Sequence, residues 1–313
     1  MKTPQPLPEP LALTPFTCQE AADAGVSLRR LRHGALSSPS RGIRVPKYER
    51  LPGPGLPELV RPFTRVTEFS AASHATAFTF WQFPGFLAGT EDPRIHISRP
   101  DRMAIPRRTG VFGHVGQFFD DEIVSVGGLL VTSRVRTWLD IARRMSVEEL
   151  TVVADHLVRN PRPEFEVRRE PYATREQLAD MLDRHKGTPG IRKARIALEM
   201  ARVGADSAPE TRLRLALEQA GLPEPELNVP TELRPGVVRE PDLGYPEYKV
   251  AVEYEGEGHS EPGQIVRDIA REEDYSRAGW LPVRISKRHM QHYALSAVAK
   301  VRDALLSRGW VPK

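Results

Sequence analysis

Residues 241–259 read PDLGYPEYKVAVEYEGEGH, and this stretch decides the fold of the C-terminal part of the chain. Polar and apolar residues alternate over residues 249–255, as in a β-strand whose successive side chains point to opposite faces of a sheet. The alternation places Glu253 and Glu255 on the same face. We therefore expect two carboxylates side by side at the end of a strand.

A second short strand is predicted upstream, over residues 237–242, with Asp242 near its end because Pro241 limits the strand interior. Gly and Pro within residues 244–246 predict a hairpin-like break between the two strands. Antiparallel pairing would bring Asp242 beside Glu253 and Glu255. Three converging carboxylates repel one another, and hard oxygen ligands suit Mg²⁺ or Mn²⁺. The sequence thus predicts a metal site at these three residues, and a solvated edge hairpin is the alternative.

This arrangement resembles the PD-(D/E)xK nuclease superfamily, and more closely its very-short-patch-repair endonuclease-like branch. The resemblance is carried, in chain order, by Pro241-Asp242, residues 253–256, His259, residues 267–271 and residues 279–285. It implies a metal-dependent DNA endonuclease with a restriction-endonuclease-like core. Glu255 stands where the superfamily usually has lysine, although the short-patch-repair-like branch also has an acidic residue there.

Further site residues follow from the same region. His259 is a candidate general acid or base because the unperturbed pKa of histidine is near ~6.5. Arg267 on the next predicted helix, or Arg271 one turn later, is a candidate to neutralise the scissile phosphate. A helix over residues 207–220 resembles the opening helix of the family, whose glutamate lies over the active site. Glu210 fits that position, and a charge that favours the helix N-terminus is its alternative role.

The N-terminus predicts a DNA-binding element. A capping box of Thr17 and Glu20 starts one helix, Gly25 ends it, a second helix follows over residues 28–34, and a strand follows over residues 41–46. These residues resemble the winged helix of AbiEi-antitoxin-like proteins. The resemblance implies DNA contacts from five arginines: Arg29, Arg30, Arg32, Arg41 and Arg44. A two-helix cap that packs on the next domain is the alternative.

The middle of the chain predicts a mixed α/β region. Strands are expected over residues 94–100, 111–115 and 129–132, and helices over 70–81, 132–142 and 147–157. The helices resemble the central part of AbiEi-like proteins. Three histidines, His74, His96 and His114, are scattered along the sequence, and we interpret them as partly buried or surface residues, with a metal site as the alternative. Three further residues, Arg134, Arg136 and Asp140, are expected to form a structural ion-pair network, with a DNA-backbone contact as the alternative.

The composition of the chain limits the classes of protein to which it can belong. Residues 1–205 hold 30 Lys and Arg against 23 Asp and Glu, whereas residues 206–313 hold 15 against 18. A basic body joined to an acidic site suits a phosphodiester substrate, although solubility alone also explains the charge. We expect no membrane span and no signal segment, and hence a cytoplasmic protein. The single cysteine, Cys18, excludes an intramolecular disulfide.

The predicted fold is therefore α/β in the α+β sense, in four segments: a winged helix with linker (1–62), an AbiEi-like mixed α/β domain (63–160), a helical bridge (161–205) and an endonuclease-like domain (206–313). Residues 46–62 and 161–171 are proline-rich and predicted as linkers. Two functions stay open. The first is a metal-dependent DNA endonuclease acting in repair or phage defence. The second is an AbiEi-like antitoxin or regulator with a silent nuclease-like domain and a toxin or other protein partner.

Overall fold

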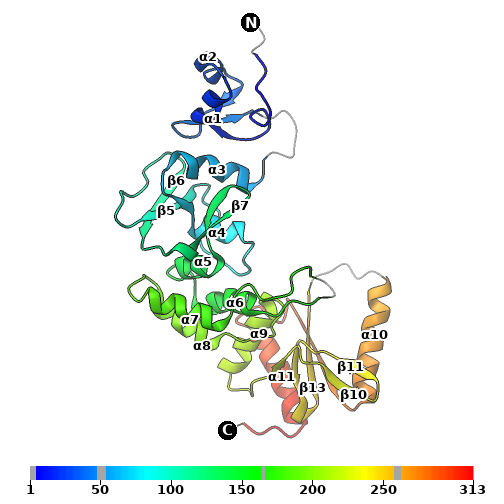
Figure 1. Cartoon of the computed structure of the whole chain (residues 1–313). Coiled ribbons are helices and arrows are strands. Elements are labelled where there is room, and N and C mark those ends of the chain that lie inside the picture. The colour runs from blue at the N-terminus through cyan, green and yellow to red at the C-terminus, as the bar shows by residue number, and fades with distance from the viewer. Residues whose placement is uncertain (1–4, 48–53, 164–165, 257–261, 313) are drawn as a thin grey trace. The chain divides into compact units, whose positions relative to one another are not determined.

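The computed structural model describes residues 5–47, 54–163, 166–256 and 262–312, with side chains omitted for 262–268. Helices and mixed sheets together give an α+β fold, as predicted (Figure 1). The chain divides into two compact units. The N-terminal unit comprises Met1–Met145 and Gln177–Ala194, and the C-terminal unit comprises Ser146–Glu176 and Arg195–Lys313.

The N-terminal unit begins with two short helices and a three-stranded antiparallel sheet. In chain order the elements are β1 (Phe16–Thr17), α1 (Cys18–Asp23), α2 (Leu28–Leu31), β2 (Leu36–Ser37) and β3 (Ile43–Pro46). The predicted capping box is confirmed, because the Thr17 hydroxyl accepts from the Glu20 N–H at 3.0 Å and the Glu20 carboxylate accepts from the Thr17 N–H at 2.7 Å. The second helix is shorter than predicted, since Arg32 is already its C-cap.

The predicted linker over residues 46–62 is wrong at its C-terminal end, where α3 (Leu56–Val66) forms. Pro57 lies in the first turn, where its missing N–H needs no partner. Val60 and Phe63, three residues apart, are buried on one helix face. Phe63 packs in one cluster with Ile43 of β3, so the N-terminal sheet and α3 share a core.

A five-stranded sheet in the order β6-β5-β4-β8-β7 forms the centre of the N-terminal unit. Its strands are β4 (Ala71–Ala72), β5 (Ile95–Pro100), β6 (Val111–Gly116), β7 (Ile123–Val126) and β8 (Leu129–Thr132), with α4 (His74–Phe80), η1 (Asp120–Glu122) and α5 (Arg134–Ile141) between or after them. The predictions for β5, β6 and β8 are confirmed. Strand β7 was not predicted. It pairs with β8 through a turn at Gly127 and Gly128, both at positive φ.

Two helices lie where the chain passes between the units, α7 (Arg175–Arg184) and α8 (Ile191–Met200). The C-terminal unit then contains α6 (Val147–Val158), α9 (Ala208–Gln219), β9 (Glu226–Leu227), β10 (Thr231–Arg234), β11 (Val237–Arg239), β12 (Leu243–Tyr245), η2 (Pro246–Tyr248), β13 (Val250–Glu255), α10 (Pro262–Arg277), β14 (Leu281–Ser286) and α11 (Leu295–Ser307). Its sheet has the order β14-β13-β12-β9, in which β13 and β14 are parallel and the other pairs antiparallel.

The predicted pairing of residues 237–242 with the following strand is wrong. The structure pairs β12 with β13, while β11 pairs with β10 in a separate hairpin. Pro241 lacks an N–H and interrupts the chain between β11 and β12. The reversal lies two residues later than predicted, at η2, where Lys249 adopts a left-handed conformation with φ 51°. Asp242 therefore precedes a strand instead of ending one.

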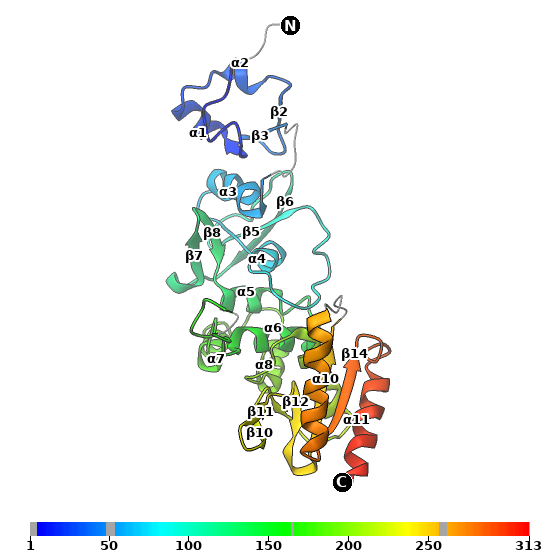
Figure 2. The ribbon, with the colours of Figure 1, turned by 90° about the vertical axis from the view of Figure 1, so that its right-hand side faces the viewer.

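The C-terminal sheet is covered on both faces. Val250 and Val252 of β13 pack in one cluster with side chains of α9 and α11. Ala251, on the opposite face, packs with Tyr275 and Trp280 at the end of α10 and just beyond it. Figure 2 shows β14 between α10 and α11. This helix–sheet–helix layering places the end of β13 beneath α10.

Candidate functional site

Glu253 lies near the carboxyl end of β13 on the face that α10 covers. Its side chain is 13% exposed, and its two oxygens accept from the Tyr275 hydroxyl at 3.0 Å and from the Arg271 guanidinium at 3.1 Å. Arg271 and Tyr275 are one helical turn apart, so α10 presents both to the strand. Burial raises the pKa of Glu253, and Arg271 only partly opposes this effect.

Asp242 is held beside Glu253 by the pairing of the two strands. Because Leu243 is paired with Val252, the residue before β12 lies next to the end of β13. The Asp242 carboxylate accepts from the Tyr254 N–H at 2.6 Å, which fixes its orientation. Burial raises the pKa of Asp242 to about 7, with further contributions from the negative charges of Glu210 and Glu253.

Glu210, in the first turn of α9, is the third acid of this group. Its carboxylate accepts from the Ser207 hydroxyl at 2.7 Å, the Asp206 N–H at 2.8 Å and the Asn228 side chain at 2.9 Å. The side chain is buried, and burial raises its pKa. Ser207 caps the helix by accepting from the Glu210 N–H at 3.4 Å, and the charge of Glu210 in the first turn contributes to the raised pKa of Asp242.

We call Glu210, Asp242 and Glu253 the carboxylate cluster. Each carboxylate is held in place by hydrogen bonds, each has a raised pKa, and Arg271 is the cation that contacts the cluster among the described residues. Within that same part of the chain, no three His, Cys, Asp or Glu side chains are grouped closely enough to hold a metal ion as they stand. The cluster is an electrostatic group of acids whose oxygen ligands match a hard divalent cation.

Glu255 does not join the carboxylate cluster. It is about half exposed and forms an ion pair with Arg284 of β14, with 2.9 Å between the charged atoms. Arg284 also binds Glu272 of α10 at 2.9 Å. The position at which the resemblance expects a lysine or an acid is therefore occupied by one half of a surface ion pair.

Two other predicted site residues have side chains outside the part of the chain that the structure describes. His259 lies outside the described residues, and Arg267 lies in α10 with its side chain outside the description. Three partners of the carboxylate cluster, Asn228, Tyr275 and Ser207, were not predicted as site residues. The spacing of Arg271 and Tyr275 on one helix was an available signal for Tyr275, whereas nothing in the sequence pattern singles out Asn228.

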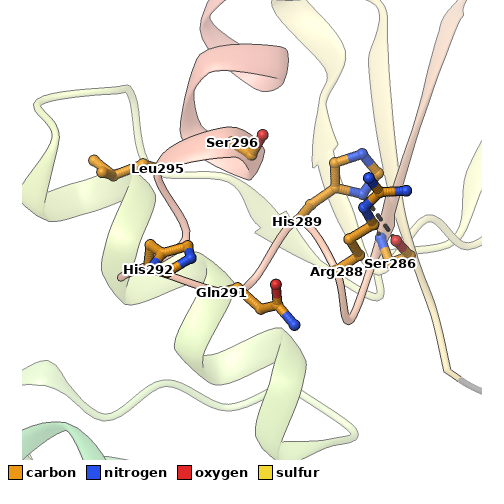
Figure 3. A pocket seen from close by; sticks show the side chains of 7 residues that line it. All are labelled: Ser286, Arg288, His289, Gln291, His292, Leu295 and Ser296. Carbon is orange, nitrogen blue, oxygen red and sulfur yellow. Dashed lines mark hydrogen bonds between the residues drawn. The ribbon is translucent and has the colours of Figure 1, made fainter.

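A pocket of about 780 Å³ lies in the segment that links β14 to α11 (Figure 3). Ser286, the last residue of β14, lines this pocket. Ser286 is paired with Glu255, so the pocket lies next to the end of β13. The Ser286 N–H donates to Nδ1 of His289 at 3.0 Å, which folds the segment back. Arg288 and His292 also line the pocket, and neither residue was predicted as a site residue from the sequence.

The five N-terminal arginines differ in their availability for DNA. Arg30 donates to the Gln5 carbonyl at 2.7 Å, and Arg44 donates to the Leu31 carbonyl at 2.9 Å, so both are engaged within the fold. The other three, Arg29, Arg32 and Arg41, are exposed, and no described side chain pairs with them. These three form the accessible part of the predicted DNA-binding surface.

Comparison with known proteins adds distant relatives without described functions. The chain is 30% identical over 161 residues to an uncharacterized protein of Mycobacterium tuberculosis strain CDC 1551 / Oshkosh, and equally to one of strain ATCC 25618 / H37Rv. The match covers 51% of this chain and 56% of each relative, so the chain spans about half the length of the curated relatives it matches. No family model and no solved structure matches.

None of the helices in the described residues combines the length and apolar character that crossing a lipid bilayer requires.

Proposed function

We propose that this protein is a divalent-metal-dependent endodeoxyribonuclease that uses the carboxylate cluster as its active site. The observation that carries the proposal is the raised pKa of all three acids, which reaches about 7 for Asp242. Burial of carboxylates that interact electrostatically costs free energy that a bound cation would offset.

The chemistry of the donor set fits Mg²⁺ or Mn²⁺, since all available ligand atoms are oxygens. Asp242 and Glu253 would hold the ion, with Glu210 next to them and Glu255 as a further ligand after release from Arg284. The ion would supply Lewis-acid polarisation of the phosphodiester and acidify a water molecule. Because the Asp242 carboxyl must lose its proton first, metal binding should strengthen as the pH rises through about 7.

The chain's own cations complete the proposed site. Arg271 is 48% exposed and contacts Glu253, so its guanidinium can also bind a phosphate oxygen of the substrate. Arg288 and His292 line the pocket at the same sheet edge and are suited to neighbouring phosphates. His259 is the proposed general acid or base, and Arg267 a further phosphate contact. DNA would be held on the N-terminal unit by Arg29, Arg32 and Arg41, in a protein of the cytoplasm.

A second function is favoured by the ion pair of Glu255 and Arg284. A catalytic lysine is absent from this position, and its replacement is neutralised by a neighbouring arginine. This pairing supports a DNA-binding regulator of the AbiEi-antitoxin type, in which the nuclease-like domain is silent and contacts a toxin or another protein. The two functions share the DNA-binding unit and differ in whether DNA is cut.

Incubation of the full chain with supercoiled plasmid and with mismatched duplexes, in Mg²⁺, in Mn²⁺ and in EDTA, tests the first proposal. The variants are Asp242→Asn and Glu253→Gln, which remove a charge with little change in volume. Glu273→Gln is the matched control, because Glu273 lies on the exposed side of α10 and pairs with Arg277.

We expect nicking that requires the metal, persists in Glu273→Gln and is lost in both site variants. Nicking that persists in Asp242→Asn and Glu253→Gln would refute the carboxylate cluster as the active site. Intact DNA in every lane, with a gel shift that weakens as salt rises, would instead support the regulator.

A further inference from the structure

A second cavity, of about 860 Å³, lies wholly within the N-terminal unit, and the proposed nuclease function does not use it. Its wall includes the carboxyl-terminal part of β6, the end of α5 and the segment after α7. Six lining residues matter here: His74, His114, Asp140, Arg143, Arg144 and Lys186. We call this space the histidine cavity.

Three histidines that are far apart in the sequence lie next to one another in the fold: His74 and His114 line the cavity, and His96 is buried behind them. The rings of His74 and His114 stack with centroids 3.6 Å apart and planes 8° from parallel. Nε2 of His114 lies 3.0 Å from Nδ1 of the buried His96. Strand β5 and the parallel strand β6 bring His96 and His114 together, and α4 adds His74.

These histidines are neutral at physiological pH. Burial lowers the pKa of His74 and of His114 to about 3, and that of His96 to about 4. Neutral rings stack without repulsion, and they offer polar nitrogen atoms and aromatic faces but no positive charge. The positive charge at the histidine cavity therefore comes from other residues.

Three cations at the histidine cavity have no acidic partner among the described residues: Arg143, Arg144 and Lys186, all of them exposed. Arg144 is seated against Gly89, where any side chain would come within 2.5 Å of its guanidinium. Arg136, in contrast, is buried and neutralised by Glu122 and Asp140. Uncompensated charges on one wall of a cavity attract an anion.

Asp140 requires a hydrogen-bond donor, whereas the three cations attract an anion. Its Oδ1 accepts from the Arg136 guanidinium at 2.8 Å, whereas its Oδ2 is buried and has no hydrogen-bond partner. A buried acceptor without a donor costs about 1–3 kcal/mol. A ligand with an N–H or O–H group in the histidine cavity would satisfy this oxygen.

We propose that the histidine cavity binds a small phosphorylated ligand of the nucleotide class. The phosphate would be held by Arg143, Arg144 and Lys186, and a donor of the base or sugar would bind Asp140. The His74–His114 stack provides an aromatic face for the base. The cavity volume lies in the range of about 300–1,000 Å³ that is usual for small-molecule sites.

Titration calorimetry of the full chain in EDTA tests this proposal, with adenosine monophosphate, adenosine and inorganic phosphate as probes. We expect the monophosphate to bind at least about tenfold more tightly than either half-probe, because it alone meets both requirements. Arg144→Ala should weaken its binding about tenfold, the value of one charge-assisted hydrogen bond. Arg102→Ala is the matched control, since Arg102 is exposed in the same unit and does not line the cavity.

Asp140→Asn tests the hydrogen bond from the ligand to Asp140 separately from the binding of phosphate. Asparagine can keep the acceptor for Arg136 but replaces Oδ2 with a donor, so binding of the monophosphate should fall while that of inorganic phosphate stays unchanged. Glu253→Gln should bind as the unaltered chain does, which separates this site from the nuclease site. Circular dichroism of each variant verifies folding.

Three results would overturn the proposal: no binding of the monophosphate at millimolar concentration, equal binding of all three probes, or unchanged binding in folded Arg144→Ala. A 12-base-pair duplex that binds through Arg144 while the monophosphate does not would reassign the cavity to nucleic acid.

Discussion

Replacing Asp242 with asparagine should stabilise the C-terminal unit at alkaline pH. The Asp242 carboxyl is buried with Glu210 and Glu253, and its pKa is about 7 in the folded protein against 3.8 for an unperturbed aspartate. Above pH 7 the folded chain must therefore bury the negative charge of Asp242. Asparagine keeps an oxygen for the Tyr254 N–H, which lies 2.6 Å away, and carries no charge.

The size and sign follow from proton linkage. A rise of about three pKa units corresponds to about 4 kcal/mol at about 1.36 kcal/mol per unit. Because the folded pKa of Asp242 is the higher one, its protonated form contributes stability that is complete below pH 4 and lost as the pH rises to 7. The gain from Asp242→Asn should thus be near zero at pH 4, grow between pH 4 and 7, and level off at no more than about 4 kcal/mol. The pKa values of Glu210 and Glu253 are raised as well and are coupled to that of Asp242, so the free energy belongs to the group of three acids.

Native-state hydrogen exchange, measured by mass spectrometry on peptides that cover β13 across a urea series at pH 5 to 8, reports the opening free energy of this unit. EDTA keeps metal ions out of the comparison. Asp303→Asn is the control, since Asp303 is an exposed acid of the same unit. If Asp242→Asn raised the opening free energy equally at pH 5 and pH 8, or lowered it at pH 8, the electrostatic explanation of the carboxylate cluster would be refuted.

Three further stability predictions concern the N-terminal unit, each measured by thermal unfolding of the full chain. Arg136→Met removes the cation shared by the buried Glu122 and Asp140, of which Glu122 keeps contacts with His185 and Arg184, and should cost about 3–5 kcal/mol; an unchanged melting temperature would contradict the buried network. Thr17→Ala removes the helix cap and should cost about 1 kcal/mol, whereas Thr17→Ser should be close to neutral. Gly113→Ala would place a methyl group 2.1 Å from the Pro106 carbonyl and should cost about 1–3 kcal/mol through forced movement, while Gly34→Ala, at a glycine without positive φ and with open space around it, is the tolerated counterpart.

The longer helices and strands were predictable because their signals are local. The Thr17–Glu20 capping box, the alternation along β13 and the apolar spacing of α11 depend on residues within one or two turns of each other. The ion pair of Arg136 with Asp140 is also local, since four residues separate them on α5. The expectation of a structural network is confirmed for Arg136 and Asp140, whereas the guanidinium of Arg134 lies over the Trp81 ring.

The predicted strand pairing failed because several local patterns competed. Residues 237–239 and 243–245 both resemble strands, and Pro241 between them is compatible with either as the partner of β13. Only the buried positions of Leu243 and Tyr245 in the core with α9 and α11 select β12. Asp242 still reaches Glu253, but from the start of a strand.

By itself, the sequence determined the secondary structure of the longer elements, the α+β class and the acids near the end of β13, because these depend on spacing along the chain. Tertiary structure alone decided which groups meet. It brought Glu210 to Asp242, gave Glu255 to Arg284 instead of to the acids, and gathered His74, His96 and His114 from three elements. Such contacts join residues tens of positions apart, and their positions follow from packing of helices on sheets, which no local pattern encodes.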